Sequence, residues 1–365
     1  ATLPLLLHAQ PHRALFLGLG TGITFAAASV QPGLEADGVE LVQEIVEAMP
    51  WFEPFNAWPR EKAFRVYVAD ARRFVRASTA KYDVIVADLF HPARDGAGFL
   101  YSLEHYQAIQ ARLAPAGLVC QWLPLYQLDA PMLRVIFGTF LEVFPDAAVF
   151  LLRFNVDTPV IGLVSGLPAG GFAPDYFAQR VTDPNLIEHL NAEQVRDGFH
   201  LLGCYVGGTD AIRRFCAGAP LNTDDHPRVV FGAPRSFVNS PRPGNLLLEL
   251  LKTCSSDVRE LVRGGSSFGS DYADALAAFV SARDAYLRGL VLESNGERGA
   301  ALAAYLDSVR LSPRFNTGYA QCLSIAAQES KNNPQLARQM LESLIQLRPE
   351  WPVAEQLMKR LPLGQ

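Results

Sequence analysis

Short apolar runs alternate with glycine-containing turns and helical stretches through the first half of the chain. The run Ala14-Leu15-Phe16-Leu17 is followed by Gly18-Leu19-Gly20-Thr21-Gly22 and then by small residues from Ile23 to Ser29. A strand, a tight glycine turn and a helix in this order are typical of the start of a doubly wound α/β domain. We therefore predict an open, mostly parallel sheet for this half of the chain.

Later apolar runs continue this alternation. The pattern predicts strands at residues 39–42, 64–68, 82–87 and 118–122, the last after a turn at 115–117, and then an antiparallel pair at 147–154 and 159–165. Helical spacing predicts helices that end near Met49 and helices at 103–113, 133–144 and 185–199.

Acidic residues stand where predicted strands end, at Glu40, Asp70 and Asp88. Because parallel strands end at the same edge of a sheet, these carboxylates and the glycine turn should converge on one crevice. An acid about twenty residues after a glycine turn can accept the hydroxyl protons of a ribose, and Asp70-Ala71 would lie where an adenine amino group sits. Two alternatives stay open: Glu40 as a solvated carboxylate, and Asp88 as the cap of the next helix.

Glycine and proline gather at residues 168–174 and 234–243, which predicts boundaries near both segments. From about residue 272 the composition shifts to Ala, Leu, Arg and Glu with helical spacing. We therefore expect a linker at 236–271 and a helical tail at 272–365.

The helical tail contains an internal similarity. Leu311-Ser312-Pro313-Arg314-Phe315 is echoed 36 positions later by Leu347-Arg348-Pro349-Glu350-Trp351, and two amphipathic stretches precede each copy. Helix pairs at this period look like tetratricopeptide-type repeats, whose usual period is about 34 residues. Such repeats either bind a partner or pack against a neighbouring domain, and both roles stay open.

Composition narrows the function classes. The chain has 365 residues, a formal net charge of −5 and five cysteines with no C-x-x-C pair. The absence of a general basic field argues against sequence-independent nucleic-acid binding, and the cysteine pattern favours thiols in a reducing compartment. No stretch approaches the roughly 18 consecutive apolar residues that a membrane span needs.

Six motifs in the first 127 residues resemble those of one enzyme family. They are Pro11 to Gly22 as a nucleoside-binding glycine loop, Val39 to Val42 as a ribose-binding strand, Val68 to Ala71 as an adenine contact, Tyr82 to Asp88 as the strand before a catalytic aspartate, Leu100 to Tyr106, and Pro115 to Gln121. In this order and spacing they resemble the polyamine aminopropyltransferases, the spermidine and spermine synthases, a branch of the S-adenosylmethionine-dependent methyltransferase fold. The resemblance implies a Rossmann-like domain over residues 1–235, with a core at 11–167 and a family-specific extension at 168–235.

The resemblance also implies an activity and the residues that serve it. The enzyme would be a transferase of polyamine biosynthesis that moves an aminopropyl group from decarboxylated S-adenosylmethionine to an amine acceptor and releases methylthioadenosine. Asp88 would be catalytic, His91, Gln121 and Tyr126 would contact the acceptor, and the donor would be bound by Gly18, Gly20, Thr21, Gly22, Glu40, Asp70 and Ala71. No metal and no tightly bound cofactor are expected, because decarboxylated S-adenosylmethionine or S-adenosylmethionine itself serves as co-substrate.

Two positions depart from the family pattern. Thr21 and His91 stand where aminopropyltransferases usually carry aspartates that pair with the cationic donor and the cationic acceptor. For His91 two roles stay open: a hydrogen-bond acceptor in place of the missing aspartate, and a purely structural residue. An anion opposite a cation in a partly desolvated cleft contributes on the order of 1–3 kcal/mol, so selection for two polycationic substrates should be weaker. Two alternatives therefore stay open: a methyltransferase or other sulfonium chemistry, and a non-catalytic nucleoside-binding scaffold whose repeat tail engages a partner.

Two segments resemble a narrower group. Gln121 to Leu128 and Thr223 to Pro227 resemble bacterial spermidine synthase-like proteins in which this domain is often fused to a membrane transporter-like region. This likeness predicts a membrane-embedded region upstream of Ala1 and a cytoplasmic location, either alone or as the cytoplasmic-side domain of a membrane protein. A homodimer and a protein partner for the repeats are further expectations.

Two further groups of residues carry open alternatives. The turn Asp224-Asp225-His226 is expected to cap a helix or act as a lid rather than to bind a metal, because it lacks a second cluster of ligands. Aromatic residues after the second predicted helix would either stack on adenine or pack in the core: Trp51, Phe52, Phe55 and Trp58.

Overall fold

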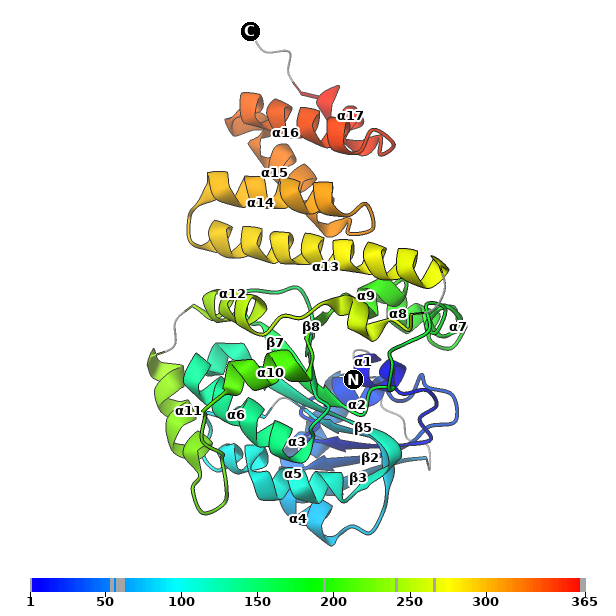
Figure 1. Cartoon of the computed structure of the whole chain (residues 1–365), viewed down its shortest axis with the longest axis vertical. Helices are drawn as coiled ribbons and strands as arrows, with labels where there is room; N and C mark the ends of the chain where they lie inside the picture. Colours follow the sequence, from blue (N-terminus) through cyan, green and yellow to red (C-terminus); the bar gives the residue numbers. More distant parts are fainter. Residues whose placement is uncertain are drawn as a thin grey trace. The chain divides into compact units, whose positions relative to one another are not determined.

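The computed structural model describes residues 2–52, 56, 63–88, 90–192, 195–239, 242–264 and 267–361. The chain divides into two compact units, residues 1–263 and residues 264–365. Figure 1 shows strands only in the first unit, whereas the second is built from helices alone in its described part.

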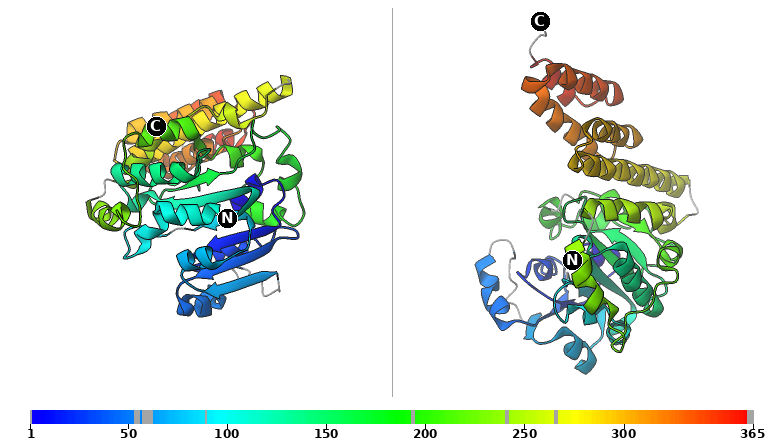
Figure 2. Two further views of the ribbon diagram at one scale, coloured as in Figure 1. Left: turned by 60° about the horizontal axis from the view of Figure 1, so that its bottom comes forward. Right: turned by 90° about the vertical axis from the view of Figure 1, so that its left-hand side faces the viewer.

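The strands of the first unit form one twisted sheet (Figure 2) in the order β3-β2-β1-β4-β5-β7-β6-β8. Their bounds are β1 (Arg13–Leu17), β2 (Glu35–Glu40), β3 (Phe64–Val68), β4 (Tyr82–Ala87), β5 (Leu113–Pro124), β6 (Ala148–Leu151), β7 (Val160–Ser165) and β8 (Tyr205–Gly207). The pairs among β1 to β5 are parallel, and β7 is antiparallel to both β5 and β6. This confirms the predicted Rossmann-like, methyltransferase-like α/β fold with a mostly parallel sheet and a late antiparallel pair.

One helix of the first unit precedes the strands along the chain, and the others lie between and after them. They are α1 (Thr2–Leu7), α2 (Ile23–Ala26), α3 (Gln43–Ala48), α4 (Ala71–Ala77), α5 (Leu103–Gln110), α6 (Ala130–Val143), α7 (Ala178–Val181), α8 (Ile187–Ala192), α9 (Gly198–Leu202), α10 (Thr209–Cys216), α11 (Arg228–Asn239) and α12 (Pro243–Thr253), with short 3-10 turns η1 (Met49–Phe52), η2 (Ala97–Tyr101), η3 (Leu125–Gln127) and η4 (Val258–Leu261). Helices α4, α5, α6 and α10 pack one after another along the sheet (Figure 1). None of the described helices combines the length and the apolar character needed to cross a membrane.

Strand boundaries differ from the sequence prediction most clearly in β2, which spans residues 35–40 rather than 39–42, and in β5, which spans residues 113–124 rather than 118–122. The second strand ends at Glu40 instead of continuing to Val42, because the chain turns there and the N–H of Val42 donates to the Glu40 carboxylate (3.1 Å). The expected turn at 115–117 lies inside the continuous strand β5, where the register with β4 shifts and Ala116 has a positive φ of 59°. A bulge therefore absorbs the residues that the sequence assigned to a turn.

A buried carboxylate holds the strands together at their amino ends. Asp37, 1% exposed, accepts hydrogen bonds from Arg13 (3.1 Å), Arg65 (2.7 Å) and Tyr82 (2.8 Å), which come from β1, β3 and β4. The charge is thus paired and fully hydrogen-bonded, as burial requires. This cluster lies at the edge of the sheet opposite to the strand ends that carry the predicted site.

The range 236–271, expected as a linker, contains the end of α11 and all of α12 and η4. Helix α12 buries its apolar residues Leu246, Leu247 and Leu250. The second unit consists of α13 (Ser267–Ser294), α14 (Arg298–Leu311), α15 (Thr317–Asn332), α16 (Pro334–Leu347) and α17 (Val353–Met358), in which α13 packs on α14 and α15 on α16 (Figure 2).

The two echoed segments of the helical tail have similar packing roles. Phe315 is 2% exposed and meets Phe279 edge-on, with ring centroids 5.1 Å apart. Trp351 meets Tyr319 edge-on at 4.6 Å. Each copy thus places an aromatic ring against a preceding helix, while the assignment to the tetratricopeptide class stays a prediction.

Candidate active site at the carboxyl ends of the strands

The glycine turn after β1 adopts a left-handed backbone at three positions. Gly18, Gly20 and Gly22 have φ angles of 78°, 53° and 81°. A side chain at Gly18 would meet the ring of Phe90 at 2.8 Å, whereas nothing lies within 4 Å of a Cβ placed on Gly20. Glycine is favoured at these positions because a positive φ is energetically unfavourable for residues with a Cβ. The open space beside Gly20 lets a ligand approach the backbone.

Glu40 fixes this turn through its carboxylate. Its Oε2 accepts hydrogen bonds from the N–H groups of Leu19 (3.0 Å) and Gly20 (3.1 Å), and its Oε1 accepts the N–H of Val42 (3.1 Å). The residue is 9% exposed, so the alternative of a solvated strand-end carboxylate is wrong. Whether Glu40 also receives ribose hydroxyls stays a prediction.

Asp70 and Ala71 lie beside Glu40 at the start of α4. The N–H of Ala69 donates to the carbonyl of Glu40 (2.8 Å), which joins the ends of β2 and β3. Asp70 is half-buried and caps α4 by accepting the N–H of Arg73 (2.8 Å). One of its oxygens is thereby engaged in a helix cap, a structural role beyond the predicted contact with adenine.

Asp88 follows β4 directly and lies next to the glycine turn. Its N–H donates to the carbonyl of Leu17 (2.9 Å), the last residue of β1, and the residue is half-buried. The strand order reverses between β1 and β4, so Asp88 and the glycine turn flank the topological switch point of the sheet. Crevices at such points are where open α/β sheets bind ligands.

His91 pairs with Gln127, a residue that the sequence pattern does not single out. The side-chain Nε2 of Gln127 is bonded to Nδ1 of His91. This contact engages one ring nitrogen of His91 with a side chain of η3. His91 has no carboxylate, so this position lacks the negative charge of the aspartate that the family usually carries there.

Gln121 and Tyr126 lie at the end of β5. Gln121 pairs in register with Ala87, the last residue of β4, and is 0% exposed. Its Nε2 donates to the carbonyl of Trp122 (3.1 Å), and its Oε1 has no partner within the described residues. Tyr126 in η3 is partly buried, and this burial raises the pKa of its hydroxyl.

The turn around Asp224 is tied to α4 and α5. Both carboxylate oxygens of Asp224 accept hydrogen bonds from the guanidinium of Arg72, at 2.8 and 2.6 Å. The carboxylate also accepts hydrogen bonds from Arg76 (3.1 Å) and Ser102 (2.8 Å), and the backbone N–H of Asp224 donates to Glu104 (2.9 Å). Burial alone would raise the pKa of Asp224, but these hydrogen bonds, led by that of Arg72, lower it to about 2. In the described part of the chain, no three His, Cys, Asp or Glu side chains form a metal-binding group.

The sequence contains no local signal for this ion pair, because Arg72 and Asp224 are separated by 152 positions. Arg72 directly follows Ala71, so the turn is anchored next to the predicted adenine contact. His105 lies fully buried in the same region, and burial lowers its pKa to about 3, with the nearby Arg72 and Arg76 adding to the effect.

Of the aromatic residues singled out by sequence, Phe55 and Trp58 lie outside the described residues, as does Leu89 beside Asp88. Trp51 is 87% exposed and Phe52 40% exposed, so neither packs in the core. Stacking on a base remains a prediction for these two rings.

The first part of the chain matches a known family. Residues 1–151 match the family model described as spermine/spermidine synthase domain. Among curated proteins, the polyamine aminopropyltransferase 2 of Hyperthermus butylicus is 31% identical over 147 residues, which cover 38% of this chain and 47% of that protein. The spermidine synthase of Dictyostelium discoideum is 28% identical over 120 residues, which cover 32% of this chain and 42% of that protein. The polyamine aminopropyltransferase of Saccharolobus solfataricus is 25% identical over 198 residues, covering 52% and 63%.

Solved structures give weaker likenesses. Spermidine synthase from Thermotoga maritima matches with a TM-score of 0.39 and 20% identity over 46% of this chain and 58% of that chain. Human methyltransferase-like protein 13 in complex with SAH matches with a TM-score of 0.37 and 18% identity, over 53% of this chain and 86% of that chain. Because these scores are low, the fold assignment rests on the strand order of the chain itself.

The chain spans about half the length of the curated relatives it matches, between 42% and 63% for these three. The region that the family model matches, residues 1–151, contains the glycine turn, Glu40, Asp70 and Asp88. Through residues 1–151, the chain is therefore similar to the spermine/spermidine synthase domain.

Proposed function

We propose that this protein transfers an aminopropyl group from decarboxylated S-adenosylmethionine to an amine and releases methylthioadenosine. One observation carries the proposal: the glycine turn, Glu40, Asp70 and Asp88 follow four adjacent parallel strands at one edge of the sheet. The similarity of residues 1–151 to the spermine/spermidine synthase domain supports it.

In this proposal the nucleoside of the donor lies over the ends of β1, β2 and β3. The open backbone at Gly20 admits the ligand, Glu40 accepts the ribose hydroxyls, and Asp70 accepts the adenine amino group. The ribose hydroxyls must either displace the N–H groups of Leu19 and Gly20 from the Glu40 carboxylate or donate to it beside them. Oε1 accepts only the N–H of Val42, so this oxygen can accept a ribose hydroxyl as well.

The reaction is a single displacement at carbon. The acceptor loses a proton to Asp88, its nitrogen lone pair forms the new C–N bond, and the electrons of the breaking C–S bond neutralise the sulfonium as methylthioadenosine leaves. Asp88 thus acts as base and counter-charge, and the remaining contribution is the alignment of the two reactants at about 3 Å. The position of Asp88 beside the end of β1 supports this role.

The site has fewer anions than that of an enzyme built for polycationic substrates. Neither Thr21, predicted on the donor side, nor His91, predicted on the acceptor side, has a carboxylate, and the side chain of His91 pairs with Gln127. Gln121 supplies a buried amide oxygen without a partner in the described structure. We therefore expect an acceptor with fewer charges than a polyamine, because neutral groups stabilise ammonium ions less than carboxylates do.

Calorimetry separates the candidate functions. The protein is titrated with S-adenosylmethionine, its decarboxylated form and methylthioadenosine. Selective binding of the decarboxylated donor supports aminopropyl transfer. Comparable binding of the carboxylated donor favours methyl transfer, because Thr21, unlike an aspartate, does not repel the carboxylate of S-adenosylmethionine. A protein that binds none of the three ligands cannot be a nucleoside-dependent transferase.

Turnover tests the role of Asp88. Product formation from decarboxylated donor and a series of mono- and diamines is measured for the protein, for Asp88→Asn, and for Asp95→Asn as a matched control on the exposed loop that follows. The Asp88 variant should lose about 100-fold or more in turnover, the usual range for a general base. Equal turnover in both variants would remove Asp88 from the mechanism.

The remaining sequence-based assignments stay proposals. These are the division into residues 1–235, 236–271 and 272–365, a partner-binding role for the repeats, a homodimer, and a location in the cytoplasm or on the cytoplasmic side of a membrane. Limited proteolysis followed by mass determination tests the first, since a linker at 236–271 predicts cleavage inside it.

A further inference from the structure

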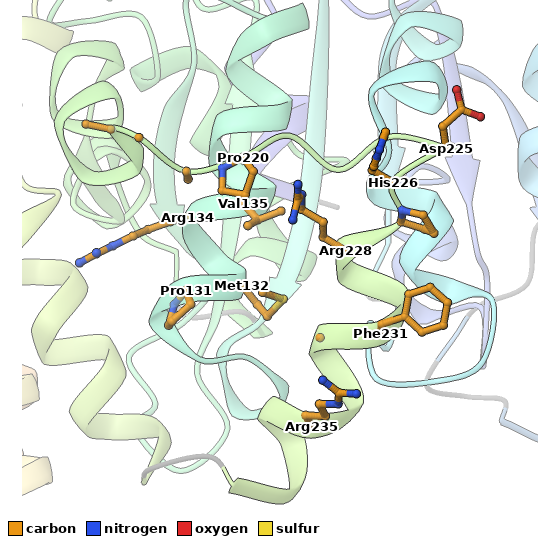
Figure 3. Close-up of a pocket in the computed structure, with 15 residues that line it drawn as sticks. Pro131, Met132, Arg134, Val135, Pro220, Asp225, His226, Arg228, Phe231 and Arg235 are labelled. Carbon is orange, nitrogen blue, oxygen red and sulfur yellow. The ribbon is translucent and has the colours of Figure 1, made fainter.

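A large cavity lies outside the predicted active site. It has a volume of about 790 Å³, within the range of small-molecule sites, and Figure 3 shows its lining residues. They come from the start of α6, the loop at 217–220, the turn at 225–227 and the first half of α11. None of them is among the residues predicted to bind donor or acceptor.

Two helices form the apolar part of this cavity. Met132 and Val135 on α6 face it together with Pro220 and Phe231, the last on α11 (Figure 3). The helices approach closely at Gly232, where a Cβ would lie 2.2 Å from the sulfur of Met132. Glycine at this position therefore allows the close packing of α6 and α11, and the ring of Phe231, 67% exposed, is left as an apolar surface for a ligand.

Positive charge dominates the polar lining. Arg134, Arg228 and Arg235 face the cavity with one carboxylate, Asp225, although the chain as a whole has a net charge of −5. The local excess of cations repels an amine substrate, so this cavity and an amine-binding site cannot be the same.

The arginines differ in how far they are already engaged. Arg134 lies 3.7 Å from Glu249 and stacks over the ring of Phe215 at 5.2 Å. No ion pair between described residues involves Arg228, which is exposed at the start of α11. A guanidinium of this kind binds phosphate, sulfonate or carboxylate groups through paired N–H donors.

We propose that this cavity binds a small amphipathic anion, an organic molecule with one or two acidic groups and an apolar body. The acidic group pairs with Arg228, and the apolar body lies against Phe231, Met132 and Val135. An extended polyanion fits less well, because the carboxylate of Asp225 also lines this cavity. The proposal does not depend on the transferase activity.

The probe is anilinonaphthalene sulfonate, a fluorescent amphipathic anion, titrated into the full chain. We expect saturable binding that Arg228→Gln weakens about tenfold, the loss expected for one charge-assisted pair. Arg153→Gln, which removes the same charge from an exposed site that does not line the cavity, should leave the affinity unchanged. Phe231→Ala should weaken binding by a few fold, whereas Phe237→Ala, exposed on the same helix and outside the cavity, should not.

Two further titrations decide between ligand classes. Pyrophosphate should displace the dye, and phenylnaphthylamine, its uncharged relative, should bind at least tenfold more weakly. Equal losses in Arg228→Gln and Arg153→Gln, or equal affinity for the charged and uncharged dyes, would overturn the proposal. Displacement by a single-stranded oligonucleotide at lower phosphate concentration than by pyrophosphate would also overturn it, since the site would then prefer a polyanion.

Discussion

Replacing Glu40 with glutamine should loosen the glycine turn before any ligand binds. The carboxylate accepts N–H groups from Leu19, Gly20 and Val42, at 3.0, 3.1 and 3.1 Å. Glutamine keeps one acceptor oxygen but places an NH₂ group where the other oxygen stood. That group faces backbone N–H groups, so the amide leaves one donor (Val42) or two donors (Leu19 and Gly20) without an acceptor, depending on which way it turns.

The size of the effect follows from these bonds. A hydrogen bond to a charged acceptor contributes roughly 1.5–3 kcal/mol, and a buried donor left unsatisfied costs roughly 1–3 kcal/mol. Glu40 is 9% exposed, so water replaces the lost acceptor only in part. We expect Glu40→Gln to lower the free energy of local opening by about 2 kcal/mol, which corresponds to about 30-fold faster exchange of the affected amides.

Hydrogen exchange followed by mass spectrometry measures this opening in peptides that contain residues 18–22 and 40–42. Glu35→Gln is the matched control, because Glu35 is exposed at the start of the same strand. Exchange in these peptides should accelerate in the Glu40 variant and stay unchanged in the Glu35 variant. If both variants exchange at the wild-type rate, the carboxylate does not hold the turn and our account of Glu40 is refuted.

Three further predictions concern stability. Asp224→Asn should destabilise the first unit by about 1–2 kcal/mol in urea unfolding, because two arginines of α4 lose their carboxylate partner. The difference in stability between the wild type and this variant should shrink as the pH falls from about 4 toward 2, the lowered pKa of Asp224. An unchanged urea midpoint in the variant would show that the ion pairs do not contribute to stability. Burial lowers the pKa of His105 to about 3 in the folded protein, whereas the unfolded chain protonates this side chain near pH 6.5. The free energy of unfolding of the wild type should therefore fall below pH 6.5, by up to about 1.4 kcal/mol per pH unit, and His105→Leu should flatten this dependence. Parallel pH profiles for the two proteins would contradict this prediction. Gly18→Ala should lower the thermal midpoint more than Gly33→Ala, since both have positive φ but only at Gly18 would a Cβ meet Phe90, and equal shifts would rule out that clash.

The local pattern of the sequence determined most of the strands near the site. A run of apolar residues followed by Gly18-Leu19-Gly20-Thr21-Gly22 predicts β1 and its turn, because positive φ needs glycine and buried parallel strands are continuously apolar. The acids after β2, β3 and β4 were assigned to one edge for the same reason, since parallel strands end together.

Only the tertiary structure decided the contacts between distant segments. The pairing of Arg72 with Asp224 and of His91 with Gln127 depends on how helices and loops pack, and no periodicity encodes it. The same holds for β5, where apolar pairing with β4 and β7 carries the strand through a predicted turn. It holds as well for the cationic cavity, because its arginines come from α6 and α11, nearly a hundred positions apart, and become neighbours only when the two helices meet at Gly232. Local spacing predicts which segments form strands, whereas the burial of side chains between elements determines where β2 and β5 end and which residues face one another.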